Sequence, residues 1–126
     1  MELSFAKLHG LGNDFVFIDD RDRALSLTDA QVSYLCDRHF GIGADGVILV
    51  RPATSEEGDG YMHYINADGT LAQMCGNGVR CFAKYLVDRE LADVASGHLL
   101  ADTLAGPRPI AFSVDAGGRM TEATVN

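Results

Sequence analysis

The residues best suited to take part in a reaction lie between Asn66 and Cys81, in the run NADGTLAQMCGNGVRC. Cys75 stands where a strand pattern gives way to a helical pattern. Two glycines flank Asn77, so the backbone there can approach a ligand closely. The first N–H groups of a helix lack partners inside the helix and favour negative charge, which suits both a thiolate and a bound carboxylate. The segment therefore predicts an acid/base thiol beside an anion-binding helix N-terminus.

Each of these residues also has a structural interpretation. A free cysteine is most often a small buried hydrophobe, so the position of Cys75 alone does not settle its role. Arg80 could stabilise a thiolate or be a solvated charge on the helix. Asn13 and Asn66 both stand in turn sequences, where asparagine tolerates unusual backbone angles and caps turns, so turn formation competes with ligand binding.

The remaining cysteines, Cys36 and Cys81, are predicted to be structural. Cys36 falls on an apolar helical stripe, and Cys81 on a helix face. Three cysteines are a poor disulfide framework. If Cys75 and Cys81 share a helix they are separated by a rise of about 9 Å, whereas a disulfide needs Cα atoms within about 7 Å. We therefore expect free thiols.

Neither a metal site nor a dinucleotide site is expected. The C-x5-C spacing and the scattered histidines match no usual zinc pattern, and His39 is better explained as a helix-terminal residue favoured by the dipole. Gly41, Gly43 and Gly46 spell G-x-G-x-x-G. That fingerprint must follow a strand and open a helix, whereas here a helix comes before it and a strand after it.

The pattern along the chain predicts an α+β domain of mainly antiparallel strands and two helices. Thr28 to Gln31 fits a capping box that opens the first helix, and Val79, Phe82, Ala83 and Leu86 mark the core face of the second helix. Helices are expected at 29–39 and from about 77, and strands at 3–9, 14–19, 47–50, 61–67, 97–104, 109–115 and 119–125.

Bulk composition excludes several classes of protein. The 126 residues carry a net charge of −8 and are 47% hydrophobic, which is ordinary for one globular domain. Phosphate backbones would be repelled, so nucleic acid is not an expected partner. The N-terminus shows neither a signal peptide nor a membrane span, so we expect no membrane association and a reducing cytoplasmic location.

Taken together, three blocks resemble the diaminopimelate epimerase family. They are KLHGLGNDF at 7–15, CDR at 36–38 with GIGADG at 41–46, and NADG at 66–69 with MCGNGVRC at 74–81. Each block alone is weak, but their order and separations match those of the family. The resemblance spans nearly the whole chain.

The resemblance implies a cofactor-independent epimerisation, without pyridoxal phosphate, in which two cysteines face opposite sides of the substrate α-carbon. Cys75 matches the first of these cysteines. Backbone N–H groups of Gly76 and Asn77 would hold the substrate α-carboxylate, and Asn13 and Asn66 match positions that bind substrate. The implied reaction converts LL- to meso-2,6-diaminopimelate in lysine and peptidoglycan precursor synthesis. Gly46 lies where some relatives carry a substrate-contacting glutamine, so that contact would be lost.

The resemblance also implies that residues 1–126 form an N-terminal domain, with a sheet wrapped around a central helix as one half of a two-domain fold. In the family, a second domain supplies the other catalytic cysteine, and this sequence does not contain that domain. We therefore expect the chain alone to be inactive. We expect a homodimer in the full-length protein, and self-association where the absent domain leaves apolar surface exposed.

Two alternatives remain open. One is racemisation of another amino acid on the same fold, although proline racemase-like relatives tend to carry a histidine where this chain has Asn77. The other is a non-catalytic truncated domain with a reactive thiol.

Overall fold

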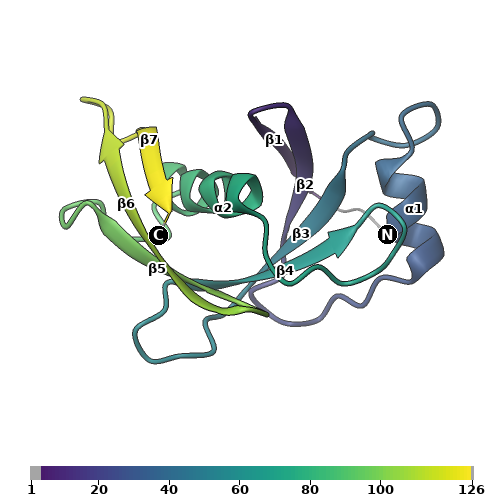
Figure 1. Cartoon of the computed structure of the whole chain (residues 1–126), viewed down its shortest axis with the longest axis horizontal. Helices are drawn as coiled ribbons and strands as arrows, with labels where there is room; N and C mark the ends of the chain where they lie inside the picture. Colours follow the sequence, from purple (N-terminus) through teal and green to yellow (C-terminus); the bar gives the residue numbers. More distant parts are fainter. Residues whose placement is uncertain (1–3, 126) are drawn as a thin grey trace.

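The computed structural model describes residues 4–125 and contains one sheet and two helices (Figure 1). The order along the chain is β1 (Ala6–Gly10), β2 (Asn13–Asp19), α1 (Asp29–Cys36), β3 (Gly46–Arg51), β4 (Gly60–Asn66), α2 (Gly76–Asp88), β5 (His98–Thr103), β6 (Gly106–Val114) and β7 (Met120–Val125). The part of the predicted strand 3–9 that precedes residue 4 lies outside the described residues.

The seven strands pair in sequence order, from β1 to β7, in a mixed sheet. β2 pairs with β3, and β4 with β5, in parallel, and the other neighbours are antiparallel. The expectation of mainly antiparallel strands holds for four of the six pairs. The other two are parallel because α1 and α2 serve as the crossovers that parallel neighbours require.

The sheet curls around α2, which is enclosed between the β1–β2 hairpin and the β6–β7 hairpin (Figure 1). Eight of its 13 residues are buried, more than a helix lying on a flat sheet would bury. The predicted core face is confirmed, with Val79, Phe82, Ala83 and Leu86 at most 1% exposed. A sheet wrapped around a central helix is therefore the observed architecture.

Over β2, β3 and the end of β4, the opposite face of the sheet is also covered, by α1 and the segments around it. In β2, Phe15 and Phe17 belong to the core around α2, whereas Val16 and Ile18 pack in a second core with Val32 of α1. A strand covered on both faces reads as an unbroken apolar run rather than as an alternation. This explains the run FVFI at 15–18.

Helix α1 begins as predicted but ends earlier. Thr28 and Gln31 form the expected capping box. The helix ends at Cys36, because the Asp37 carboxylate accepts hydrogen bonds from the backbone N–H groups of His39 and Phe40 and turns the chain away. His39 is exposed outside the helix, so the prediction that it is a helix-terminal residue is wrong.

The G-x-G-x-x-G run closes the end of α1. The N–H groups of Ile42 and Gly43 both donate to the carbonyl of Leu35, and that of Ala44 donates to Cys36. A Cβ at Gly41 would lie 1.8 Å from the Tyr34 carbonyl oxygen, so no side chain fits there. These glycines close the C-terminus of α1 and lead into β3, so a helix precedes them and a strand follows, as predicted.

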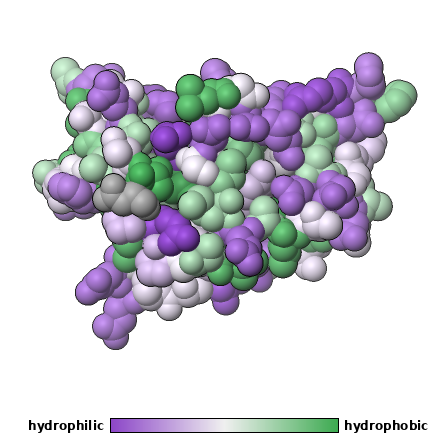
Figure 2. All heavy atoms as spheres, in the orientation of Figure 1, coloured by the Kyte–Doolittle hydropathy of each residue, from purple (hydrophilic) through white to green (hydrophobic). Residues whose placement is uncertain are grey.

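The surface is mixed in character. Figure 2 shows polar side chains over most of one face, with apolar side chains in separate groups between them. Neither helix within residues 4–125 combines the length and the apolar character needed to cross a bilayer.

Candidate active site

Cys75 occupies the N-cap position of α2. Its φ of −140° and ψ of 125° are extended, and its carbonyl accepts the first intrahelical bond, from Val79 N–H at 2.8 Å. Its side chain makes no capping hydrogen bond, and the residue is partly exposed. Cys75 thus packs against the core around α2 but stays partly exposed, at the point where the helix dipole favours negative charge.

The backbone beside the sulfur supplies unused donors. Within residues 4–125, the N–H groups of Gly76, Asn77 and Gly78 precede the first intrahelical bond and have no acceptor. A Cβ at Gly76 would meet no atom within 4 Å, whereas Gly78 faces inward, toward Phe15 and Ile48. Free N–H groups at a helix N-terminus are suited to bind a small anion.

Asn13 is brought to the same helix end. It begins β2, and its Oδ1 accepts a 2.7 Å hydrogen bond from Asn77 Nδ2. Arg80 Nη1 in turn donates to Asn77 Oδ1 at 3.0 Å. Arg80 is thus hydrogen-bonded to the asparagine rather than standing free on the helix surface.

Asn13 is also hydrogen-bonded to a charged cluster of Asp14, Asp45 and Arg38. Asn13 Nδ2 donates to Asp45 Oδ2 at 3.2 Å, and the Asp14 backbone N–H donates to the same oxygen at 3.0 Å. Arg38 donates twice to Asp14, at 2.8 and 2.9 Å, and once to Asp45 at 3.2 Å. The hydrogen bonds from Arg38 hold the pKa of Asp14 well below its usual range, so this carboxylate stays ionised.

Asn66 stands at the same end of the sheet but in a different setting. It ends β4 opposite Gly46, which in turn lies opposite Phe15 of β2. Its Nδ2 donates to Thr70 Oγ1 at 3.2 Å, and its backbone closes the turn over 66–70. The structure therefore gathers Asn13, Gly76 and Asn77 at Cys75 and places Asn66 in the turn that leads there.

Gly46 is buried under an aromatic ring. A Cβ there would lie 2.5 Å from Tyr64 Cε1 and 2.8 Å from the Ile65 carbonyl oxygen. Tyr64 is 8% exposed and meets Phe15 edge to face. Burial raises the pKa of its phenol, and the nearby sulfur of Cys75 adds to the effect. A larger residue at position 46 would require this ring to move.

The other two thiols are unsuited to proton transfer. Cys81 is 5% exposed in the core around α2, and burial raises its pKa to about 11. Cys36 is 6% exposed in the second core, and burial raises its pKa as well. Both were expected to be structural, and their surroundings agree. Cys75 alone among the three is partly exposed at a helix N-terminus.

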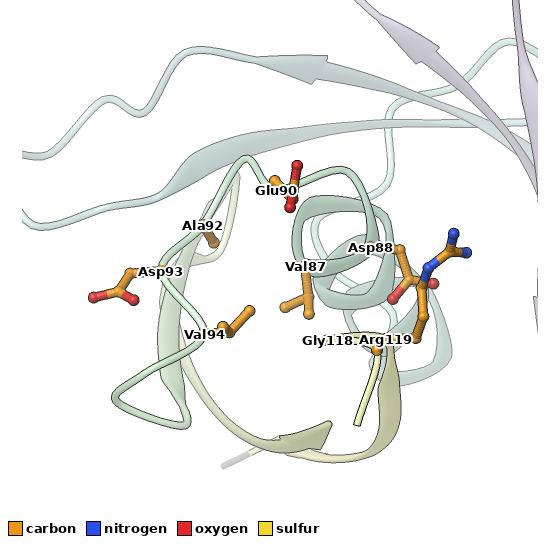
Figure 3. A pocket seen from close by; sticks show the side chains of 9 residues that line it. Val87, Asp88, Glu90, Ala92, Asp93, Val94, Gly118 and Arg119 are labelled. Atoms are coloured by element: carbon orange, nitrogen blue, oxygen red, sulfur yellow. The ribbon is translucent and has the colours of Figure 1, made fainter. Parts of the chain in front are cut away.

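A hollow of about 450 Å³ lies at the opposite end of α2, around Asp88, Val94 and Arg119 (Figure 3). Asp88 lies thirteen positions after Cys75 along the helix, a rise of about 20 Å. The Asp88 carboxylate already accepts from Lys84 and from the Met120 N–H. This hollow is remote from the thiol, so the candidate site remains the N-terminal end of α2.

The sequence did not single out the side chains of Asp14, Arg38 and Asp45. Each stands inside one of the motif blocks, next to a residue that was noted, but a charge beside a glycine-rich turn looks like ordinary surface. Asp14 and Arg38 are 24 residues apart, and Asp14 and Asp45 are 31 apart. The parallel pairing of β2 with β3 brings Asp14 and Asp45 together, and the turn after α1 adds Arg38.

The sequence matches one family of known proteins along most of its length. The family model for diaminopimelate epimerase matches residues 5–125. The diaminopimelate epimerase of Thermosynechococcus vestitus is 49% identical over 125 residues, which cover 96% of this chain and 42% of the relative. That of Mycolicibacterium smegmatis is 46% identical, over 96% of this chain and 46% of the relative. The chain thus spans less than half the length of these relatives.

Solved structures show the same fold at low sequence identity. A probable proline racemase from Agrobacterium radiobacter superposes with a TM-score of 0.75 at 13% identity, over 98% of this chain and 41% of that one. A hydroxyproline epimerase from Agrobacterium vitis gives 0.75 at 13% identity, over 96% and 40%. The fold agrees with these structures, and the sequence match decides among its families: the chain belongs to the diaminopimelate epimerase family.

Proposed function

We propose that this chain forms one half of the active site of a cofactor-independent epimerase that acts on 2,6-diaminopimelate, with Cys75 as one of two acid/base thiols. One observation carries the proposal. The Cys75 side chain is partly exposed and makes no capping bond at the end of α2, beside three backbone N–H groups that have no acceptor in residues 4–125.

The proposed chemistry follows from this arrangement. The substrate α-carboxylate accepts hydrogen bonds from the N–H groups of Gly76 and Asn77, which places the α-carbon near Cys75 Sγ. The thiolate takes the α-proton: the C–H bond breaks, an S–H bond forms, and the electron pair stays on the carbon and is delocalised into the carboxylate. Fixed donors aimed at that carboxylate stabilise the charge as it develops. A second thiol on the opposite face then protonates the carbon and inverts it.

The second thiol must come from outside this domain. Cys36 and Cys81 are buried in two different cores, and burial raises the pKa of each. The relatives are more than twice as long as the part of them that this chain matches. We infer that residues 1–126 act as an N-terminal domain and that a following domain supplies the partner thiol, so the 126-residue chain alone has no epimerase activity. A thiol pair of this kind requires a reducing compartment, such as the cytoplasm.

The test is to restore the second domain. The chain is joined to the part of the Thermosynechococcus relative that lies beyond the match, and conversion of LL- to meso-diaminopimelate is followed together with α-proton exchange in D₂O. We expect turnover from the chimera, none from the chain alone, and loss of at least about 100-fold on Cys75→Ala, as for removal of a general acid/base.

Cys81→Ala serves as the matched control, because it removes a thiol from the same helix without touching the open end. It should retain turnover. Activity that survives Cys75→Ala would overturn the role of this residue. A chimera that folds but turns over another amino acid in preference to diaminopimelate would favour the alternative racemase.

A further inference from the structure

Four side chains form a continuous hydrogen-bonded chain across the candidate site. Arg80 Nη1 donates to Asn77 Oδ1 at 3.0 Å, Asn77 Nδ2 donates to Asn13 Oδ1 at 2.7 Å, and Asn13 Nδ2 donates to Asp45 Oδ2 at 3.2 Å. The chain runs from α2 through β2 to the loop before β3. It joins all three blocks of the sequence that carry the family resemblance.

The charged residues at the two ends, Arg80 and Asp45, fix the direction in which the hydrogen bonds of this series are donated. A guanidinium can only donate, and a carboxylate can only accept. An asparagine amide can face either way, but here each amide must turn its oxygen toward the arginine end and its nitrogen toward the aspartate end. Any reversed amide would set two donors or two acceptors against each other, and an unmade hydrogen bond in a partly buried site is costly.

The direction decides what the site offers to a ligand. Each amide nitrogen carries two hydrogens and uses one in the chain, so Asn13 and Asn77 each retain one N–H. Each amide oxygen accepts one hydrogen bond from its neighbour in the series, so it faces that neighbour. The remaining amide N–H of each side chain can donate to an anionic group and add to the free backbone N–H groups of α2.

The aspartate end of the chain is itself held. Asp45 accepts from Arg38 at 3.2 Å and from the Asp14 backbone N–H at 3.0 Å, and its own N–H donates to Asp14 Oδ1 at 3.2 Å. Arg38 is anchored twice on Asp14, which Lys7 also contacts at 3.2 Å. With this support, Asp45 keeps one oxygen directed at Asn13.

We propose that Asp45 and Arg80 are positioning residues for substrate binding. They set the orientation of the Asn13 and Asn77 amides so that both present N–H donors to the substrate carboxylate. This inference rests on the proposed function for the identity of the ligand, but the polarity of the hydrogen-bonded chain is a property of the domain itself.

The first test uses the domain alone and requires no activity. In ¹⁵N-labelled 126-residue chain, the side-chain NH₂ resonances of Asn13 and Asn77 are assigned by substitution of each asparagine. Asp45→Asn replaces an acceptor-only group by one that also donates. We expect it to shift the resonances of Asn13 and, through Asn13, those of Asn77, which does not touch residue 45. Lys7→Met removes a neighbouring charge that is not part of the hydrogen-bonded series, so it should leave the Asn77 resonances unchanged. Unchanged Asn77 resonances in Asp45→Asn would overturn the proposal.

The second test uses the chimera described above. Arg80→Met removes the donor, whereas Arg80→Lys keeps a donor-only group at the end of a flexible stem. We expect KM for LL-diaminopimelate to rise about tenfold in Arg80→Met and in Asp45→Asn, as for loss of one hydrogen bond to a charged group, with kcat changed less than KM. Arg80→Lys should recover most of the loss.

The two proposals can fail separately. A folded but inactive wild-type chimera would count against the proposed function. The direction of the hydrogen-bonded series would then still be tested by the side-chain resonances. An active wild-type chimera with unchanged KM in both Asp45→Asn and Arg80→Met would overturn the positioning role while leaving the epimerase function intact.

Discussion

The three thiols of this chain differ in their surroundings rather than in their chemistry. Cys36 and Cys81 lie in two separate cores at 6% and 5% exposure, and burial raises the pKa of both because a thiolate loses its hydration there. Cys75 is partly exposed at a helix N-terminus. Because the thiolate is the reactive form, the reactivity of the three residues should differ strongly.

Alkylation makes this difference measurable. Native protein treated with iodoacetamide at pH 7.5 should be modified at Cys75, with Cys36 and Cys81 labelled only after unfolding. Peptide mass spectrometry with and without urea gives the result. Equal labelling of the three cysteines at pH 7.5 would contradict the burial described above.

The Asp14 carboxylate gives a prediction for pH. The hydrogen bonds from Arg38 lower its pKa in the folded state, so the ion pair stabilises the fold above the unfolded pKa of about 3.9 and loses its contribution as the pH falls below that value. Asp14→Asn should cost about 1–3 kcal/mol at pH 7. The free-energy difference between wild type and variant should shrink between pH 5 and pH 2. Urea titrations across this range measure it.

At the scale of elements, the ends of the helices decide which groups are left for chemistry. Both ends of α1 are closed: its N-terminus by Thr28 and Gln31, and its C-terminus by the N–H groups of the loop at 41–44. The N-terminus of α2 has no side-chain cap. Since a polar cap normally satisfies the first N–H groups, a helix that begins with cysteine and glycine leaves them for a ligand.

The cap of α1 can be tested directly. Thr28→Ala removes the acceptor for the Gln31 N–H and should lower the free energy of unfolding by about 1 kcal/mol. Thr28→Ser keeps the hydroxyl and should retain most of the stability. Urea denaturation followed by circular dichroism compares the three chains. A loss in Thr28→Ser as large as that in Thr28→Ala would show that the methyl group, rather than the hydrogen bond, matters here.

At the scale of the whole molecule, α2 forms the centre of the core, and its N-terminus forms part of the candidate site. Its buried face contacts the curled sheet, and its N-terminus carries Cys75 (Figure 1). Position and stability are therefore coupled, since a change that loosens the packing of the helix also displaces the thiol and its neighbouring N–H groups.

Phe82 is the most direct test of this packing. It is 0% exposed, and Phe82→Ala should cost about 3–5 kcal/mol, because it leaves a cavity between α2 and the sheet. Phe40→Ala is the matched control, since Phe40 is 78% exposed and should cost less than about 0.5 kcal/mol. Urea denaturation midpoints separate the two. Comparable losses in both variants would argue against α2 as the centre of the core.

Much of the fold follows from local sequence signals. The capping box at 28–31, the buried face of α2 and the turn at 66–70 all depend on residues that are close in sequence, so local propensity and hydrogen bonding suffice to predict them. The early end of α1 was missed, because the Asp37 side chain competes with the helix for the next N–H groups.

The sequence by itself determined that a cysteine meets a helix N-terminus flanked by glycines, and that the chain has a strand and helix pattern compatible with an α+β domain. Only the tertiary structure decided which side chains surround that cysteine. Asn13 and Asn77 are 64 residues apart, and Asp45 reaches Asn13 across 32. Contacts of this kind depend on the register of β2 against β3 and on how the sheet curls around α2, which no local propensity encodes.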